Sequence, residues 1–127
     1  MSALLFVYGT LKRGGKLHHE LASDKAQFLG LAKIRGELFH LKGVSWPGAF
    51  PSESRSRIQG ELYKLLKPAE TLKRLDRVEA THEGLFTRKL VDVWAGSRKM
   101  RSWVYFCGRE AMKSERIRTG NFRATTK

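Results

Sequence analysis

The sequence predicts an α+β domain built as a small β-barrel or strongly curved sheet with one or two short helices. Three observations support this fold class. Apolar, β-branched and aromatic residues form about six short runs of the kind found in strands. Only one segment combines helical spacing of its apolar residues with a proline at its start. The 127 residues are enough to bury one core, so we expect a single domain over residues 1–127.

Strand and loop signals alternate through the first half of the chain. Residues 4–8 form an apolar and aromatic run that predicts a buried strand, and the glycine-rich residues 9–15 predict a loop after it. A short helix is expected over residues 17–22. Two glycines divide residues 28–41 into strand-like pieces, and residues 43–56, with two prolines, are expected to form a loop.

A strand and the one clear helix follow. Residues 58–65 predict another strand. Pro68 is suited to the first turn of a helix, where its missing N–H costs nothing, and the helix is expected to end near Ala80. Glu70 and Arg74 have the i,i+4 spacing of an ion pair on this helix.

The remaining residues predict a β-hairpin and a weakly structured end. Residues 85–94 and 100–107 are rich in β-branched and aromatic residues, and an Ala-Gly-Ser turn separates them. Residues 108–127 are polar and basic and carry weak structural signals.

The composition is that of a strongly basic, folded protein. Lys and Arg number 25 against 12 Asp and Glu, so the net charge is +13. This balance permits binding of nucleic acid or other anions, but the basic residues are scattered from Lys12 to Lys127, which favours a solvated surface. The densest stretch begins at Arg98. One cysteine, Cys107, and a short opening apolar run predict a cytoplasmic protein with no membrane segment.

The loop after the first strand is the first candidate site. It opens with Tyr8, Gly9, Thr10 and Leu11. A glycine at this point lets the backbone turn sharply, so that successive N–H groups can converge on a carboxylate or a developing oxyanion. Taken alone, these residues favour an ordinary strand-to-loop turn.

Glu79, at the expected end of the helix, is the second candidate. A carboxylate there lies against the negative end of the helix dipole, so its presence indicates a compensating role. If Glu79 points partly inward, desolvation raises its pKa toward the range useful for general acid–base catalysis. The alternative is a solvated glutamate paired with Arg77 or His82. Glu83 competes for the catalytic role, but its neighbours predict an exposed turn.

Other residues that could carry chemistry have simpler interpretations. His18 and His19 are adjacent and lack the i,i+4 spacing of a helical metal site, so no metal site is predicted. Arg88 is expected either to neutralise a substrate carboxylate or to pair with Asp92. Cys107 follows an apolar strand and is expected to pack as a small buried hydrophobe.

Several short segments occur in an order that is typical of one known family. They are residues 5–14, which contain Tyr-Gly-Thr-Leu; 46–49, Trp-Pro-Gly-Ala; 60–63, Gly-Glu-Leu-Tyr; 75–79, Leu-Asp-Arg-Val-Glu; Arg88; Tyr105; and 119–122, Thr-Gly-Asn-Phe. Through these segments, which span most of its length, the chain resembles the γ-glutamyl cyclotransferase-like superfamily, and within it the γ-glutamylamine cyclotransferase branch.

This resemblance implies a mixed barrel with a cavity at the end of its first strand, and it implies no cofactor or metal. The family's substrate-binding and catalytic positions fall on Tyr8, Gly9, Thr10 and Leu11, whose backbone would hold the γ-glutamyl group, on Glu79 as the proton shuttle, and on Tyr105 as a pocket-lining aromatic residue. Arg88 is a further candidate substrate contact. Many relatives have a tyrosine two residues before this arginine, where the present chain has Phe86.

The implied reaction is an intramolecular cyclisation. The α-amine of a small γ-glutamyl substrate attacks the γ-carbonyl and releases 5-oxoproline together with an amine or amino acid, and holding the two groups together supplies much of the acceleration. Two alternatives stay open: a basic module that binds nucleic acid or another anion, and a folded but inactive relative, to which Phe86 points. Neither the leaving amine nor the oligomeric state follows from the sequence.

Overall fold

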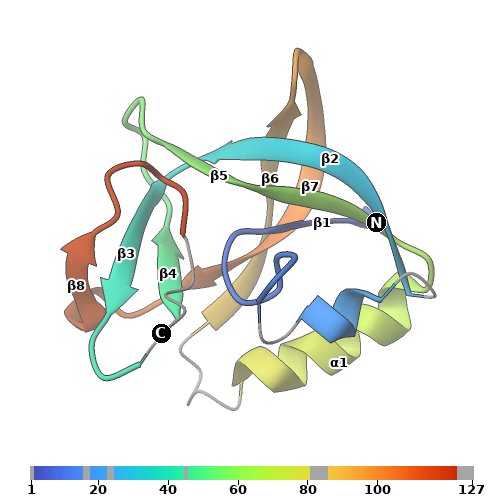
Figure 1. Ribbon diagram of the computed structural model, residues 1–127, viewed down its shortest axis with the longest axis horizontal. Coiled ribbons are helices and arrows are strands. Elements are labelled where there is room, and N and C mark those ends of the chain that lie inside the picture. Colours follow the sequence, from blue (N-terminus) through green and yellow to red (C-terminus); the bar gives the residue numbers. More distant parts are fainter. Residues whose placement is uncertain (1, 16–17, 23–24, 45, 81–85, 123–127) are drawn as a thin grey trace.

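The computed structural model describes residues 2–15, 18–22, 25–44, 46–80 and 86–122, with residues 78–80 described by their backbone only. Within these ranges one α-helix, two short 3-10 helices and eight strands form an α+β fold, as predicted (Figure 1). In chain order they are β1 Leu4–Val7, η1 His18–Leu21, β2 Ala26–Arg35, β3 Glu37–Leu41, β4 Pro47–Phe50, β5 Arg57–Leu65, α1 Pro68–Ala80, β6 Phe86–Ala95, β7 Arg98–Cys107, η2 Glu110–Met112 and β8 Lys113–Arg116.

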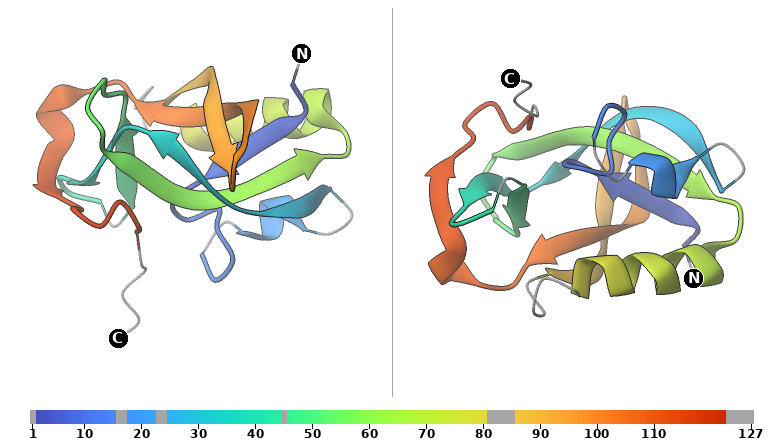
Figure 2. Two further views of the ribbon diagram at one scale, coloured as in Figure 1. Left: turned by 90° about the horizontal axis from the view of Figure 1, so that it is seen from above. Right: turned by 60° about the horizontal axis from the view of Figure 1, so that its bottom comes forward.

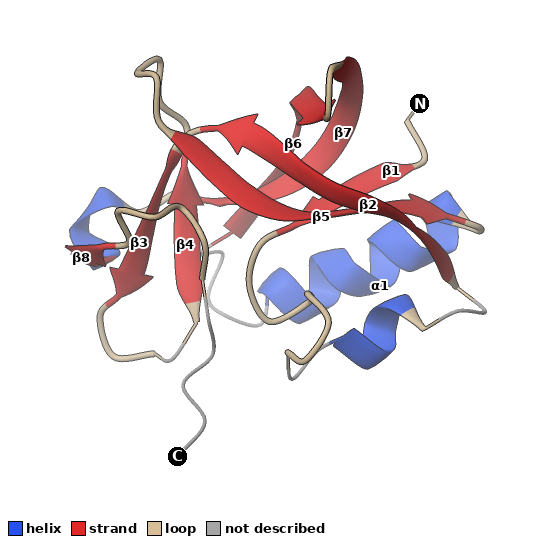
Figure 3. Ribbon diagram, turned by 45° about the horizontal axis from the view of Figure 1, so that its top comes forward, coloured by secondary structure: helices blue, strands red, loops and turns tan. Residues whose placement is uncertain are grey.

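Five of the strands close a mixed barrel in the order β1-β5-β2-β6-β7. The barrel is mixed because β1 runs antiparallel to β5 but parallel to β7, where Leu5 lies opposite Trp103. The other three strands form a small sheet in the order β4-β3-β8 beside one end of the barrel (Figure 3). The expectation of a small mixed barrel is therefore confirmed.

The barrel wall is apolar on both sides around β1, because successive side chains of a strand point to opposite faces. Phe6 belongs to the core inside the barrel, together with Ile34 and Leu62. Leu5 and Val7 belong to a second core outside the barrel, which the inner face of α1 completes with buried leucines. Figure 2 shows α1 lying along the outside of the barrel next to β1. The second core thus fixes α1 beside the end of β1.

Two glycines shape the wall of the barrel. A Cβ on Gly60 of β5 would lie 2.2 Å from the carbonyl oxygen of Val7, so only glycine lets β5 pass this close to the end of β1. Gly30 has a φ of +128° and lies at a register shift between β2 and β5. It was expected to interrupt the strand, but β2 continues through it because a β-bulge absorbs the irregularity.

Two segments differ from the sequence-based expectations. Residues 43–56 were expected to be a loop, yet Pro47–Phe50 form strand β4 and all four residues are buried. Pro47 is tolerated because it is the first residue of β4, and β4 pairs only with β3 at the edge of the small sheet. The weakly patterned end of the chain also contains structure, η2 and β8, while the expected short helix is the 3-10 helix η1.

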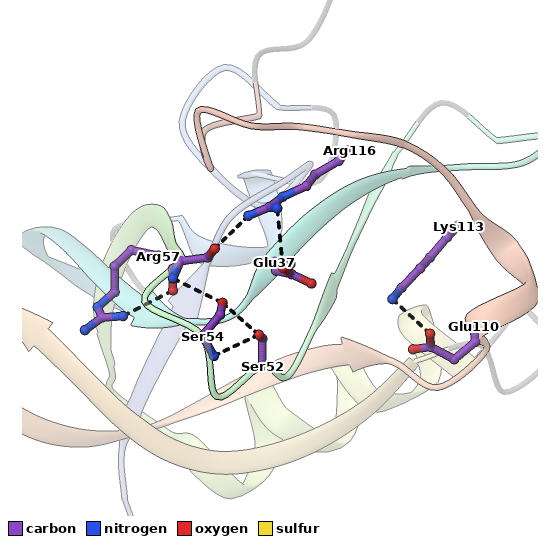
Figure 4. A network of polar contacts seen from close by, with 8 residues as sticks. Glu37, Ser52, Ser54, Arg57, Glu110, Lys113 and Arg116 are labelled. Carbon is purple, nitrogen blue, oxygen red and sulfur yellow. Dashed lines mark hydrogen bonds and ion pairs between the residues drawn. The ribbon is translucent and has the colours of Figure 1, made fainter.

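Polar contacts join β8 to β3, to the segment before β5 and to η2 (Figure 4). Arg116 of β8 donates to the hydroxyl of Ser56 at 2.6 Å and lies 3.4 Å from a carboxylate oxygen of Glu37 on β3. Lys113 pairs with Glu110 at 2.9 Å. These contacts direct the chain after β8 back toward the barrel, where Gln59 N–H donates to the carbonyl oxygen of Gly120 at 2.7 Å.

The helix is tied to the N-terminal part of the chain by an unexpected ion pair. Arg74 Nε lies 2.6 Å from Glu20 Oε1, and Arg74 also donates to the carbonyl oxygen of Glu20. The predicted pairing of Glu70 with Arg74 is therefore wrong, because η1 presents a carboxylate that is better placed. Among the helices in the described part of the chain, none has the length and apolarity needed to cross a membrane.

Candidate functional site

The loop after β1 folds into two consecutive turns. The N–H of Lys12 donates to the carbonyl oxygen of Gly9 at 3.0 Å, and the N–H of Gly15 donates to that of Lys12 at 2.8 Å. A Cβ on Gly15 would lie 2.2 Å from the carbonyl oxygen of Thr10, so glycine is required for the loop to close on itself. The loop is compact rather than extended.

The amides at the start of this loop have no internal acceptor. Within the part of the chain that the structure describes, no acceptor receives the N–H groups of Gly9, Thr10 or Leu11. Successive amides that are not used by secondary structure can bind an anion or a developing oxyanion. The structure thus leaves these three donors available at the end of β1, where the sequence predicts a cradle.

A buried carboxylate holds the far end of the loop. Glu61 Oε1 accepts hydrogen bonds from the N–H of Arg13 and from the hydroxyl of Tyr63, both at 2.9 Å. Glu61 is only 8% exposed and Tyr63 only 2%. Burial, and next the hydrogen bond to Glu61, raise the pKa of the Tyr63 phenol, so Tyr63 stays a neutral donor. Glu61 therefore joins the loop to β5.

The last described segment of the chain provides a second anchor. Lys12 Nζ donates to Asn121 Oδ1 at 3.0 Å and to the carbonyl oxygen of Phe122 at 2.7 Å. On the other side, His18 Nδ1 lies 3.0 Å from the carbonyl oxygen of Leu11. These contacts join Asn121 and Phe122 to the loop on one side and His18 to it on the other.

The side chain of Tyr8 points into the protein. Its hydroxyl donates to the carbonyl oxygen of Tyr105 on β7 at 2.7 Å and accepts the N–H of Ala49 on β4 at 3.1 Å. Tyr8 is 7% exposed, so its phenol links three strands. The contribution of Tyr8 to the candidate cradle is therefore made through its backbone, which leads directly into Gly9.

Asp76 is the centre of a second cluster, at the end of α1. Arg88 donates to both of its carboxylate oxygens, from Nε at 2.9 Å and from a terminal nitrogen at 3.0 Å. Tyr105 donates to Asp76 Oδ1 at 2.7 Å. The hydrogen bond from Arg88 is the main cause that lowers the pKa of Asp76, and the same bond raises the pKa of Arg88. The guanidinium also lies 4.2 Å from the ring centroid of Trp103.

This cluster corrects one expectation for Arg88. Its predicted pairing with Asp92 is wrong, because Asp92 pairs with Arg101 at 3.2 Å while Arg88 takes Asp76. The hairpin brings Arg88 opposite Tyr105 in the β6–β7 register, so the two residues approach Asp76 together. Two of the predicted site residues therefore meet at the last turns of α1.

Glu79 belongs to the last turn of α1, three residues beyond Asp76. Residues three apart on a helix share a face, and the rise between them is roughly 4.5 Å. The side chain of Glu79 lies outside the described residues, as do His82 and Glu83. Phe86 begins β6 and packs half-buried against the outer core. The position that carries a hydroxyl in many relatives is therefore an apolar contact in this chain.

Sequence reasoning gave no role to Asp76 or Glu61, although both stand in segments that carry the family likeness. A weak signal was present for Glu61: it is an acid placed directly before Leu62 and Tyr63 in a predicted strand, and acids in such positions are buried only with partners. Cys107 is 4% exposed, as expected, and burial raises the pKa of its thiol. Among the described residues, His, Cys, Asp and Glu side chains form no group of three that could hold a metal ion.

Comparison with known proteins identifies relatives of this chain. The profile of the family described as "Gamma-glutamyl cyclotransferase, AIG2-like" matches residues 5–124. A Methanocaldococcus jannaschii protein, named as an inferred gamma-glutamylcyclotransferase, is 33% identical over 103 residues, which cover 80% of this chain and 82% of that protein.

Solved structures share the fold. The Bacillus subtilis protein YkqA superimposes with a TM-score of 0.74 and 27% identity over 96% of this chain, which spans 40% of the YkqA chain. An AIG2-like protein from Mus musculus superimposes with a TM-score of 0.75 and 20% identity, covering 95% of this chain and 88% of the mouse chain. Taken with the profile match over nearly its full length, these likenesses show that the chain belongs to the gamma-glutamyl cyclotransferase, AIG2-like family.

Proposed function

We propose that this protein is a γ-glutamyl cyclotransferase that releases 5-oxoproline from a γ-glutamyl amine or γ-glutamyl amino acid, with Glu79 as the proton shuttle. The observation that supports it most is the anchored loop after β1: its first amides have no acceptor among the described residues, while its other end is held by Glu61 and Lys12. Family membership supports the reaction class.

The loop and the end of α1 would have different roles in the reaction. The amides of Gly9, Thr10 and Leu11 would bind either the α-carboxylate of the substrate or the γ-carbonyl oxygen as it becomes negative. Because Asp76 already neutralises Arg88, we assign Arg88 to positioning rather than to direct substrate contact. Asp76, held by Arg88 and Tyr105, would fix the helical turn from which Glu79 acts.

The cyclisation balances without a co-reactant. Glu79 takes one proton from the α-ammonium group, and the resulting amine attacks the γ-carbonyl carbon, so that a ring C–N bond forms. The C–N bond to the leaving group then breaks. Of the three ammonium protons, one stays on the ring nitrogen and two pass to the leaving nitrogen, which departs as an ammonium ion. Glu79 transfers them one at a time and is regenerated.

Of the two substrate classes, the resemblance to the γ-glutamylamine cyclotransferase branch favours γ-glutamyl amines over γ-glutamyl amino acids. A panel that contains γ-glutamyl-ε-lysine, γ-glutamyl-alkylamines and γ-glutamyl amino acids would rank the leaving groups by kcat/KM for 5-oxoproline release.

The test of the shuttle uses Glu79→Gln with Glu83→Gln as a matched control. Loss of a general acid–base group typically costs about 10²- to 10⁴-fold in rate. We expect Glu79→Gln to lower kcat by at least about a hundredfold with KM nearly unchanged, and Glu83→Gln to retain wild-type kcat. Equal activity of Glu79→Gln and the wild type would remove Glu79 from the role, and loss confined to Glu83→Gln would transfer it there.

A further inference from the structure

The outer surface of the barrel carries a cluster of basic side chains around one tryptophan, away from α1. Register places these side chains on one face: Lys33 of β2 lies opposite Trp94 of β6, and Trp94 lies opposite Lys99 of β7. Two residues further along β2, Arg35 lies opposite Arg57 of β5. We call these five residues the basic face. In Figures 1 and 3 the end of β2, the start of β5 and the tip of the β6–β7 hairpin lie away from α1.

The four cations of the basic face have no acidic partner among the described residues. Lys33, Arg35, Arg57 and Lys99 are all exposed, and among the described residues none of the four forms an ion pair with an acidic side chain. Arg57 donates instead to the backbone carbonyl oxygens of Arg55 and Ser56. Like charges directly opposite one another across two strands are destabilising, so the Arg35–Arg57 pair works against folding and indicates an external anion.

A hollow adjoins this face. It has a volume of about 410 Å³, and its lining includes Lys12, Lys33, Gln59, Trp94 and Asn121 together with one acid, Glu61, which is engaged by Arg13 and Tyr63. The volume falls in the range of small-ligand sites, roughly 300–1,000 Å³. A neighbouring hollow of about 470 Å³ shares Gln59 and Asn121 with it. The second hollow is also lined by Thr119 and Phe122, so it lies beside the last described residues.

The aromatic component selects among anions. Trp94 is half-buried and stands at the border of the hollow, and the guanidinium carbon of Arg57 lies 5.6 Å from its ring centroid. A cationic track that incorporates an aromatic ring matches single-stranded nucleic acid, whose phosphates pair with the cations while a base stacks on the ring. A mononucleotide would occupy the hollow but leave Arg35 and Lys99 unused.

We propose that the basic face binds single-stranded nucleic acid without sequence preference, with Trp94 as its stacking residue. The five residues of the basic face belong neither to the Asp76 cluster nor to the amides of Gly9, Thr10 and Leu11, although Lys12 and Glu61, which anchor the loop, also border the hollow. The proposed binding therefore does not require the cyclotransferase reaction. The cations come from three strands of the barrel, β2, β5 and β7, and not from the weakly patterned residues 108–127.

The test measures fluorescence anisotropy of a fluorescein-labelled twelve-residue oligothymidylate with the full chain. Lys33→Glu/Arg57→Glu should weaken binding at least about tenfold. The control, Lys64→Glu/Lys73→Glu, changes two exposed lysines outside the hollow and lowers the net charge of +13 by the same four units. It should weaken binding less than about threefold. Equal losses in the two double variants would show a response to net charge alone and would overturn the proposal.

A separate variant tests stacking of a base on Trp94. Trp94→Leu keeps an apolar side chain but removes the ring, and loss of base stacking should weaken oligothymidylate binding by about five- to a hundredfold. Heparin should bind the wild type and Trp94→Leu equally. Undiminished oligothymidylate binding by Trp94→Leu, or equal competition by free thymidine monophosphate, would contradict a strand-binding face. All variants should release 5-oxoproline at the wild-type rate if that activity is present, so the two proposals fail independently.

Discussion

Replacing Glu61 with alanine removes the acceptor of two hydrogen bonds at once. The hydroxyl of Tyr63 and the N–H of Arg13 both donate to Glu61 Oε1 at 2.9 Å, and Tyr63 is almost completely buried. A buried donor left without a partner costs about 1–3 kcal/mol. Because Glu61 borders a hollow that water can enter, we take the lower part of that range for each donor. The expected loss is about 2–4 kcal/mol, a large share of a typical unfolding free energy of about 5–15 kcal/mol.

Two further variants separate the charge from the acceptor. Glu61→Gln keeps an oxygen for both donors and loses only the charge assistance, so it should cost about 1 kcal/mol. Glu70→Ala removes an acid from the exposed surface of α1 and should change the free energy by less than about 0.5 kcal/mol. Urea unfolding at pH 7 gives all three values.

The same variants test the loop as a preorganised element. If Glu61 holds the loop in the conformation that binds substrate, Glu61→Ala should raise KM for a γ-glutamyl amine. Part of the binding free energy would then be spent on ordering the loop. Glu61→Gln should restore most of the affinity. If Glu61→Ala had the same unfolding free energy and the same KM as Glu70→Ala, the reasoning from burial and geometry would be refuted.

Two other changes give outcomes of known direction. Asp76 has a pKa lowered mainly by its hydrogen bond to Arg88, so its carboxylate stabilises the fold above its ordinary pKa of about 3.9, and this contribution is lost as the pH falls through the lower folded-state value. The difference in unfolding free energy between wild type and Asp76→Asn should therefore be larger at pH 7 than at pH 3 in urea titrations; a difference independent of pH would contradict it. Gly60→Ala places a Cβ 2.2 Å from the carbonyl oxygen of Val7. Overpacking of this kind costs about 1–3 kcal/mol, so the urea midpoint should fall, and an unchanged midpoint would show that β1 and β5 separate freely.

Much of the barrel could be predicted because its strands carry local signals. Apolar, β-branched and aromatic residues indicate the strands at residues 4–8 and 58–65 and the hairpin after residue 85. The proline at its start and the spacing of its apolar residues indicate the helix. Strand β4 could not be predicted this way, because Pro47 and Gly48 are typical of loops. Its strand conformation is imposed by pairing with β3 at a sheet edge.

The position of the candidate site could be predicted from the sequence, but most of its contacts could not. The loop after β1 is recognisable from its glycine, but its anchors come from residues far away in sequence: Glu61 is 48 residues from Arg13, and Phe122 is 110 residues from Lys12. The partner of Arg88 was missed for the same reason. Asp92 lies nearer along the chain, yet the outer core brings α1 against the hairpin and so presents Asp76.

A crystal of the protein soaked with 5-oxoproline tests the central claim most directly. The account predicts that the product lies at the end of β1, with an oxygen within about 3.2 Å of at least one of the amides of Gly9, Thr10 and Leu11 and with the Glu79 carboxylate facing its ring nitrogen. Product bound away from this loop, or a Glu79 side chain directed into bulk water and away from the bound ring, would contradict it.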